Sequence, residues 1–125
     1  YMENGESSLD GAIRETSEEA GACVIVKSDS LYTLFNLPKI NQMYIFFRTE
    51  LANLDFAAGI ESTEVALFSE AEIPWGEIAF PVVKSTLEHY FDDLRKNQFP
   101  VRMFDVHHGE DRSFTTNLIS SSISE

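Results

Sequence analysis

Three glutamates near the start of the chain have the spacing of ligands for a divalent cation. Glu15 lies three residues before Glu18 and four before Glu19, so on an α-helix their carboxylates project from one side. Such carboxylates repel one another, and a hard divalent cation prefers oxygen ligands of this kind. Arg14 offsets part of the charge, because it is four residues from Asp10 and from Glu18. A solvated acidic face is the alternative interpretation.

The surrounding sequence predicts the helix that positions these glutamates. Small, apolar and amphipathic residues recur at steps of three and four on the opposite stripe, namely Leu9, Ala12, Ile13, Thr16 and Ala20. A hydroxyl at Ser7 or Ser8 is placed to cap the first turn. Gly21 is placed to end the helix in the left-handed conformation, and Asn4-Gly5 predicts a turn before it.

The order of these residues resembles the Nudix box, Gly-x5-Glu-x7-Arg-Glu-U-x-Glu-Glu-x-Gly-U, in which U is apolar. The matching positions are Glu6, Arg14, Glu15, Glu18, Glu19 and Gly21. The sequence departs at three places: the leading glycine would fall before Tyr1, the first U is the amphipathic Thr16, and the last U is the small Ala22.

This resemblance to the Nudix superfamily implies a fold, a reaction and residue roles. The fold is an α/β/α sandwich around a mixed sheet, and the reaction is metal-dependent hydrolysis of a nucleoside diphosphate linked to another moiety. Glu15 and Glu19 would be the principal ligands of Mg²⁺ or Mn²⁺, with Glu18 as a third ligand. Arg14 would orient the carboxylates by hydrogen bonds. Glu6 would support the loop or an outer-sphere water.

The general base and the substrate depend on residues outside the box. The family often takes its base from a separate loop, and Glu61 and Glu64 are the candidates here, with a solvated loop as the alternative. The stretch 59–75 is similar to a subgroup that follows a zinc ribbon and has FAD and ADP-ribose pyrophosphatase activity. We therefore expect ADP-ribose, FAD or NAD(H) as substrate. The alternatives are mRNA decapping, nucleoside triphosphate hydrolysis, and a catalytically silent nucleotide-binding or regulatory domain.

Composition restricts the partners. The chain carries 9 Lys and Arg against 21 Asp and Glu, a net charge of −12, which repels nucleic acid and anionic membranes. A small nucleotide would approach the acidic box through bound metal, and a homodimer is a possible assembly. The single cysteine, Cys23, fits a reducing, intracellular compartment. We expect it to be buried at the start of a strand.

The position of the box indicates a partial domain. In the family, several strands precede the box, whereas here it begins at the first residues. We therefore expect an N-terminally truncated Nudix domain over residues 1–97. Residues 98–125 are expected to form a mobile extension, with a short strand near Phe99–Phe104 as the alternative.

Periodicity predicts the remaining elements. We expect strands at Leu31–Phe35, Gln42–Leu51 and Val65–Phe68, the second of them central because apolar residues occupy both of its faces. A capping box joins Ser69 to Glu72, and a last helix begins near Phe80. The apolar stripe of that helix is expected to be Val83, Leu87, Tyr90, Phe91 and Leu94, with Asp93 facing water. Core packing is the favoured role of the aromatic residues Tyr44 and Phe46 in the strand Gln42–Leu51. The alternative is that Phe35, Tyr44 and Phe46 contribute to the adenine side of the substrate site.

Overall fold

The computed structural model describes residues 2–27, 30–53, 68–108 and 114–121. These residues divide into two compact units, one formed by residues 1–30 and 47–68, the other by residues 31–46 and 69–125. In the described part of the chain, no helix is both long and apolar enough to cross a membrane.

The first unit contains the predicted helix and a small sheet. Helix α1 spans Ser8–Ala20 and ends at Gly21 in the left-handed conformation, as the sequence predicts. Strands β1 (Val24–Ile25) and β4 (Glu50–Leu51) pair antiparallel. Cys23, before β1, is exposed, so the expectation of a buried cysteine is wrong.

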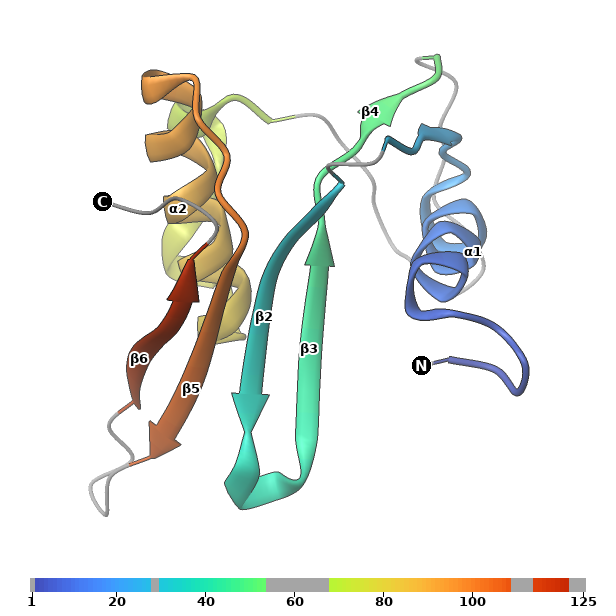
Figure 1. Cartoon of the computed structure of the whole chain (residues 1–125). Helices are drawn as coiled ribbons and strands as arrows, with labels where there is room; N and C mark the ends of the chain where they lie inside the picture. The colour runs from blue at the N-terminus through green and yellow to red at the C-terminus, as the bar shows by residue number, and fades with distance from the viewer. Residues whose placement is uncertain (1, 28–29, 54–67, 109–113, 122–125) are drawn as a thin grey trace. The chain divides into compact units, whose positions relative to one another are not determined.

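The second unit is a mixed four-stranded sheet with one helix against it. The strands are β2 (Leu31–Leu37), β3 (Gln42–Phe47), β5 (Arg102–His108) and β6 (Phe114–Ser121), in the order β3-β2-β5-β6. Strands β2 and β5 are parallel, whereas β5 and β6 are antiparallel, and Figure 1 shows β2 and β3 running in opposite directions. The 3₁₀ turns η1 (Pro38–Ile40), η2 (Glu70–Glu72) and η3 (Trp75–Glu77) connect the elements.

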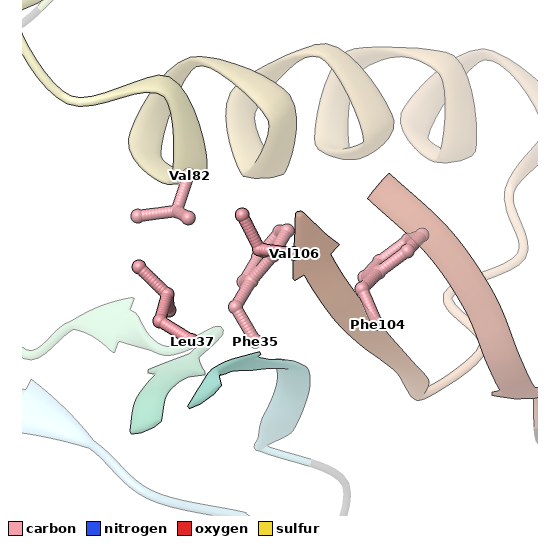
Figure 2. Close-up of a cluster of buried hydrophobic side chains, with 5 residues drawn as sticks. All are labelled: Phe35, Leu37, Val82, Phe104 and Val106. Atoms are coloured by element: carbon pink, nitrogen blue, oxygen red, sulfur yellow. The ribbon is translucent and has the colours of Figure 1, made fainter. Parts of the chain in front are cut away.

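Helix α2 (Pro81–Lys96) covers one face of this sheet. Pro81 occupies its first turn, and Asn97 ends it in the left-handed conformation. The core between the helix and the sheet, drawn in Figure 2, consists of Phe35, Leu37, Val82, Phe104 and Val106. Tyr44 and Phe46 pack against this cluster, which confirms the prediction that these aromatics are core residues. The predicted mixed α/β class is likewise confirmed.

Three predictions about the second unit are wrong. The expected central strand Gln42–Leu51 is divided: β3 lies at one edge of the described sheet, and β4 pairs elsewhere. The strand is interrupted at Arg48, whose N–H donates to the carbonyl of Ser30 at 2.6 Å. Strand β3 ends just before this residue, at Phe47. The buried face of α2 also differs from the predicted one. Asp93, which was expected to face water, is 2% exposed, whereas Leu94, which was expected on the apolar stripe, is 51% exposed.

The third correction concerns the expected mobile extension at residues 98–125. Residues 102–108 form β5, which pairs with β2 over Thr33–Asn36. Phe104 and Val106 are among the most buried side chains of the core. The alternating apolar residues of this segment therefore belong to a strand of the main sheet, and residues 114–121 add β6 beside it.

Candidate metal-binding site on α1

A tight turn leads into α1 and fixes the first acidic residue of the box. The N–H of Glu6 donates to the carbonyl of Glu3 at 3.2 Å, and Gly5 between them has φ +83°, a conformation that glycine adopts without strain. Ser7 then caps the helix by accepting the N–H of Asp10 at 3.1 Å. The predicted turn and serine cap are both confirmed.

Glu6 is an anchor for Arg14. The guanidinium donates to both carboxylate oxygens of Glu6, from Nε at 3.2 Å and from Nη2 at 3.0 Å. The backbone N–H of Glu3 donates to the same carboxylate at 2.6 Å. These bonds, that from Arg14 first, lower the pKa of Glu6. With three donors engaged, the Glu6 carboxylate supports the loop.

Gly11 makes room for this anchor. It is the buried residue of α1, and a Cβ placed on it would lie 3.2 Å from Oε1 of Glu6. That approach is tighter than an ordinary van der Waals contact, so a side chain at this position would displace the carboxylate. The absence of a side chain lets Glu6 lie directly against the helix.

The remaining side of Arg14 faces two acids of the helix and one of the turn before it. Its Nη1 donates to Glu18 at 3.0 Å and lies 3.1 Å from Glu15 and 3.6 Å from Glu3. The hydrogen bond to Glu6, followed by the charges of Glu3, Glu6 and Glu18, raises the pKa of Arg14. Arg14 thus contacts carboxylates of the box on both of its sides, and its role in orienting them stays a prediction.

Glu15 and Glu19 approach each other on the same face. A side-chain hydrogen bond with Glu19 is the largest cause that lowers the pKa of Glu15, and Arg14 adds to the effect. Two carboxyl groups so close need either a shared proton or a cation between them. The oxygen-only donors, with Glu18 one turn away, fit a hard divalent cation such as Mg²⁺ or Mn²⁺.

The structure does not gather the full set of predicted ligands around one point. Within the described ranges, no group of three or more His, Cys, Asp or Glu side chains is arranged to hold a metal ion. Glu18 is turned to Arg14, while Glu15 is beside Glu19. The assignment of all three as ligands stays a prediction. The candidate bases Glu61 and Glu64 lie outside the described residues, so their role also stays a prediction.

Sequence reasoning missed a second charged cluster, which lies in the other unit. Arg102 on β5 donates two hydrogen bonds to Asp93 on α2, at 2.7 and 2.8 Å. Tyr32 on β2 donates its hydroxyl to the same carboxylate. The spacing of Val82, Thr86 and Asp93, four and then seven residues, is the signal that could have placed Asp93 on the buried stripe.

Burial and pairing control the ionisation of this cluster. Burial opposes the charge on Asp93, but the hydrogen bonds from Arg102 and Tyr32 outweigh it and lower the pKa of the carboxyl. Burial and the bond to Asp93 raise the pKa of the Tyr32 hydroxyl. The cluster joins β2, α2 and β5, and it serves the fold.

A shallow cavity of about 230 Å³ lies on the outer side of α2. Its lining residues are Glu70, Trp75, Glu88, Phe91, Asp92 and Arg95. Arg95 donates to Glu70 at 2.9 Å and to Asp92 at 3.0 Å. The guanidinium of Arg95 therefore already neutralises part of the acidic charge in this cavity.

Comparisons with known proteins give matches among solved structures. No protein-family model matches the chain, and no curated protein matches it. The crystal structure of a NUDIX hydrolase from Nitrosomonas europaea matches with 46% identity and a TM-score of 0.77, over 82% of this chain and 57% of that one. The chain thus spans little more than half of that hydrolase. The mutator MutT protein from Bacillus halodurans matches with 20% identity and a TM-score of 0.49, over 94% and 77%, which is too distant to support an argument.

Proposed function

We propose that this chain belongs to the Nudix superfamily and hydrolyses the pyrophosphate bond of a nucleoside diphosphate linked to another moiety, with Mg²⁺ or Mn²⁺. The 46% identity to the NUDIX hydrolase from Nitrosomonas europaea supports the superfamily. The observation that carries the reaction is the group of carboxylates around Arg14, namely Glu6, Glu15 and Glu18, with Glu19 one helical turn from Glu15.

In this proposal Glu15 and Glu19 hold the cation, and Glu18 joins them when it leaves Arg14. The cation would neutralise pyrophosphate oxygens and strengthen a bound water as nucleophile. Arg14 keeps its two bonds to Glu6 and so stays in place as a donor to the neighbouring carboxylates. Glu61 or Glu64 would accept the proton from the water. ADP-ribose, FAD and NAD(H) are the substrates that we propose.

The proposal is tested by assaying the complete protein on ADP-ribose, FAD and NADH, with Mg²⁺ or Mn²⁺ and with chelator. We expect metal-dependent release of AMP from at least one substrate. Glu19→Gln should lower turnover by two orders of magnitude or more, roughly the loss expected when a catalytic metal is lost. Glu77→Gln, which removes the same charge from an exposed position on η3, should leave turnover unchanged.

The same experiment separates the alternative of a catalytically silent domain. A protein that binds Mn²⁺ and ADP-ribose by calorimetry, yet releases no AMP at any metal concentration, would favour a binding or regulatory role. Full activity of Glu19→Gln at saturating Mg²⁺ would contradict the assignment of Glu19 as a ligand.

A further inference from the structure

Four of the residues that line the cavity beside α2 form one stripe of the helix. Glu88, Phe91, Asp92 and Arg95 recur at steps of three and four, so their side chains leave the helix on the same side. The buried residues of α2 belong to a different stripe. The charged groups of the cavity are therefore not part of the core between helix and sheet.

Trp75 and Phe91 give the cavity an aromatic wall. Their ring centroids are 6.1 Å apart and their planes are inclined by 72°. The indole N–H of Trp75 donates to the carbonyl of Glu70 at 3.1 Å, which fixes the ring beside the helix. Aromatic rings pack against apolar chains, and their faces attract cations. This wall is thus suited to a side chain that is both aliphatic and positively charged.

The acids of the cavity exceed its bases. Arg95 is shared by Glu70 and Asp92, whereas Glu88 makes no hydrogen bond or ion pair with another residue in the described part of the chain. Three carboxylates and one guanidinium leave the lining with a net charge of −2. The chain as a whole carries −12, which adds to the attraction of cations. The cavity therefore attracts a second cation in addition to Arg95.

We propose that this cavity receives a lysine side chain from a basic segment of a partner protein. The ammonium would pair with Glu88, and the four-carbon stem would lie along the rings of Trp75 and Phe91, as lysine stems do on apolar surfaces. Nucleic acid and anionic lipid are unsuited to this cavity, because its acids repel phosphate.

The shape of the cavity favours a side chain of a larger partner over a free amine. Its volume of about 230 Å³ is below the roughly 300–1,000 Å³ of pockets that enclose a free ligand. A shallow cavity leaves much of its occupant in water, so a small free amine gains few contacts. A protein segment brings further contacts around the cavity, while one side chain fills it.

The exposure of the charged groups predicts weak binding that depends on salt. An ion pair of exposed groups contributes little, and salt screens it further. A short peptide with few lysines should therefore bind with a dissociation constant of millimolar order or weaker. Added salt should weaken this binding, whereas a purely apolar contact with the rings would be insensitive to salt.

NMR titration of the complete protein tests the proposal with the peptide acetyl-Gly-Lys-Gly-Lys-Gly-amide. The reporter is the indole N–H resonance of Trp75, which is assigned with the variant Trp75→Phe. We expect this resonance to shift as the peptide is added, at low salt more than at high salt. The same peptide with both lysines acetylated lacks the charges and should leave the resonance in place.

Variants of the unpaired glutamate locate the contact. Glu88→Lys should weaken peptide binding about tenfold, and Glu88→Gln about two- to fivefold, since an exposed ion pair is lost. Glu77→Lys is the matched control, because Glu77 on η3 is exposed and does not line the cavity. Its binding should stay within a factor of two of the wild type. Circular dichroism confirms that each variant is folded, and if Glu88→Lys is not, Glu88→Gln decides.

The free amine 1,5-diaminopentane carries two ammonium groups, like the peptide, and separates the two sources of the cation. We expect it to bind more weakly than the peptide. Tighter binding of the amine would overturn the assignment to a protein segment. No shift with the lysine peptide, an equal shift with the acetylated peptide, or unchanged binding in the folded Glu88 variants would overturn the site itself. None of these outcomes depends on the metal site of α1.

Discussion

Two arginines in this protein each hold a carboxylate with two hydrogen bonds, and their surroundings differ in what remains after that pairing. Arg102 and Asp93 form a closed pair, with side chains 15% and 3% exposed, and the hydroxyl of Tyr32 completes it. Arg14 binds Glu6 in the same two-fold manner, but further acids of the same segment also approach it.

The difference in charge separates a structural cluster from a candidate binding site. One acid, one base and one phenol leave the Arg102 cluster balanced, so it has no further partner to recruit. One arginine among several carboxylates leaves the Arg14 cluster negative. Similar pairing chemistry thus stabilises the sheet in one unit and leaves a net negative charge in the other.

The largest effect is expected from breaking the closed pair. Asp93→Ala should lower the free energy of unfolding by about 3 kcal/mol, because it leaves the partly buried Arg102 without its counter-charge and removes the acceptor of Tyr32. Urea unfolding measures this. Glu18→Ala removes an exposed partner of Arg14 and should have a much smaller effect. Equal losses in the two variants would contradict the comparison.

A second pair of variants sharpens the same point. Replacing both charges together, with Asp93→Leu and Arg102→Met, should recover most of the stability that Asp93→Ala loses, because no buried charge then stands alone. Urea unfolding of the double variant is the measurement. A double variant as unstable as the single one would mean that the ion pair itself stabilises the fold.

The smallest effect is a difference in pH dependence. His89 stacks against Phe104 with ring centroids 5.4 Å apart, and burial, followed by the charge of Arg102, lowers its pKa below the usual 6.5. Below about pH 6.5 the unfolded chain therefore binds a proton that the folded chain resists. Stability should fall from pH 7 toward pH 5.5 as a result.

Asp93 affects stability in a different, more acidic pH range. Its folded pKa is lowered, so its stabilisation is present above about pH 3.9 and is lost as the pH falls through the folded value. Between pH 5.5 and 7 the slope should therefore depend on His89. In thermal melts His89→Gln should flatten that slope, by a few degrees at most. An unchanged slope would contradict the assignment.

The sequence predicted the elements in which local signals agree. The cap at Ser7, the stop at Gly21 and the capping box of Ser69 and Glu72 all depend on residues within a few positions of one another, and all are present. The contact of Arg14 with Glu18 also follows from spacing, since the two residues are four apart on one helix face. The contact of Arg14 with Glu6 depends instead on the turn that precedes the helix.

The sequence could not predict what depends on distant partners. In the sequence Asp93 resembles a solvent-facing acid, because its partners Arg102 and Tyr32 lie on two strands that are distant in the chain. Strand β5 resembles a tail because its partner β2 lies about seventy residues earlier. The division of Gln42–Leu51 between two sheets likewise depends on Ser30, which no local pattern indicates.

The most direct test of the cation site on α1 is a thermal melt of the complete protein across a Mg²⁺ titration at fixed ionic strength. A cation that binds only the folded arrangement raises the melting temperature by mass action. We expect a rise for the wild type and for Glu77→Gln, a smaller rise for Arg14→Ala, and none for Glu15→Gln combined with Glu19→Gln. An equal rise in Arg14→Ala would remove the orienting role of the arginine. No rise in the wild type, or the same rise in the double variant, would contradict the metal site itself.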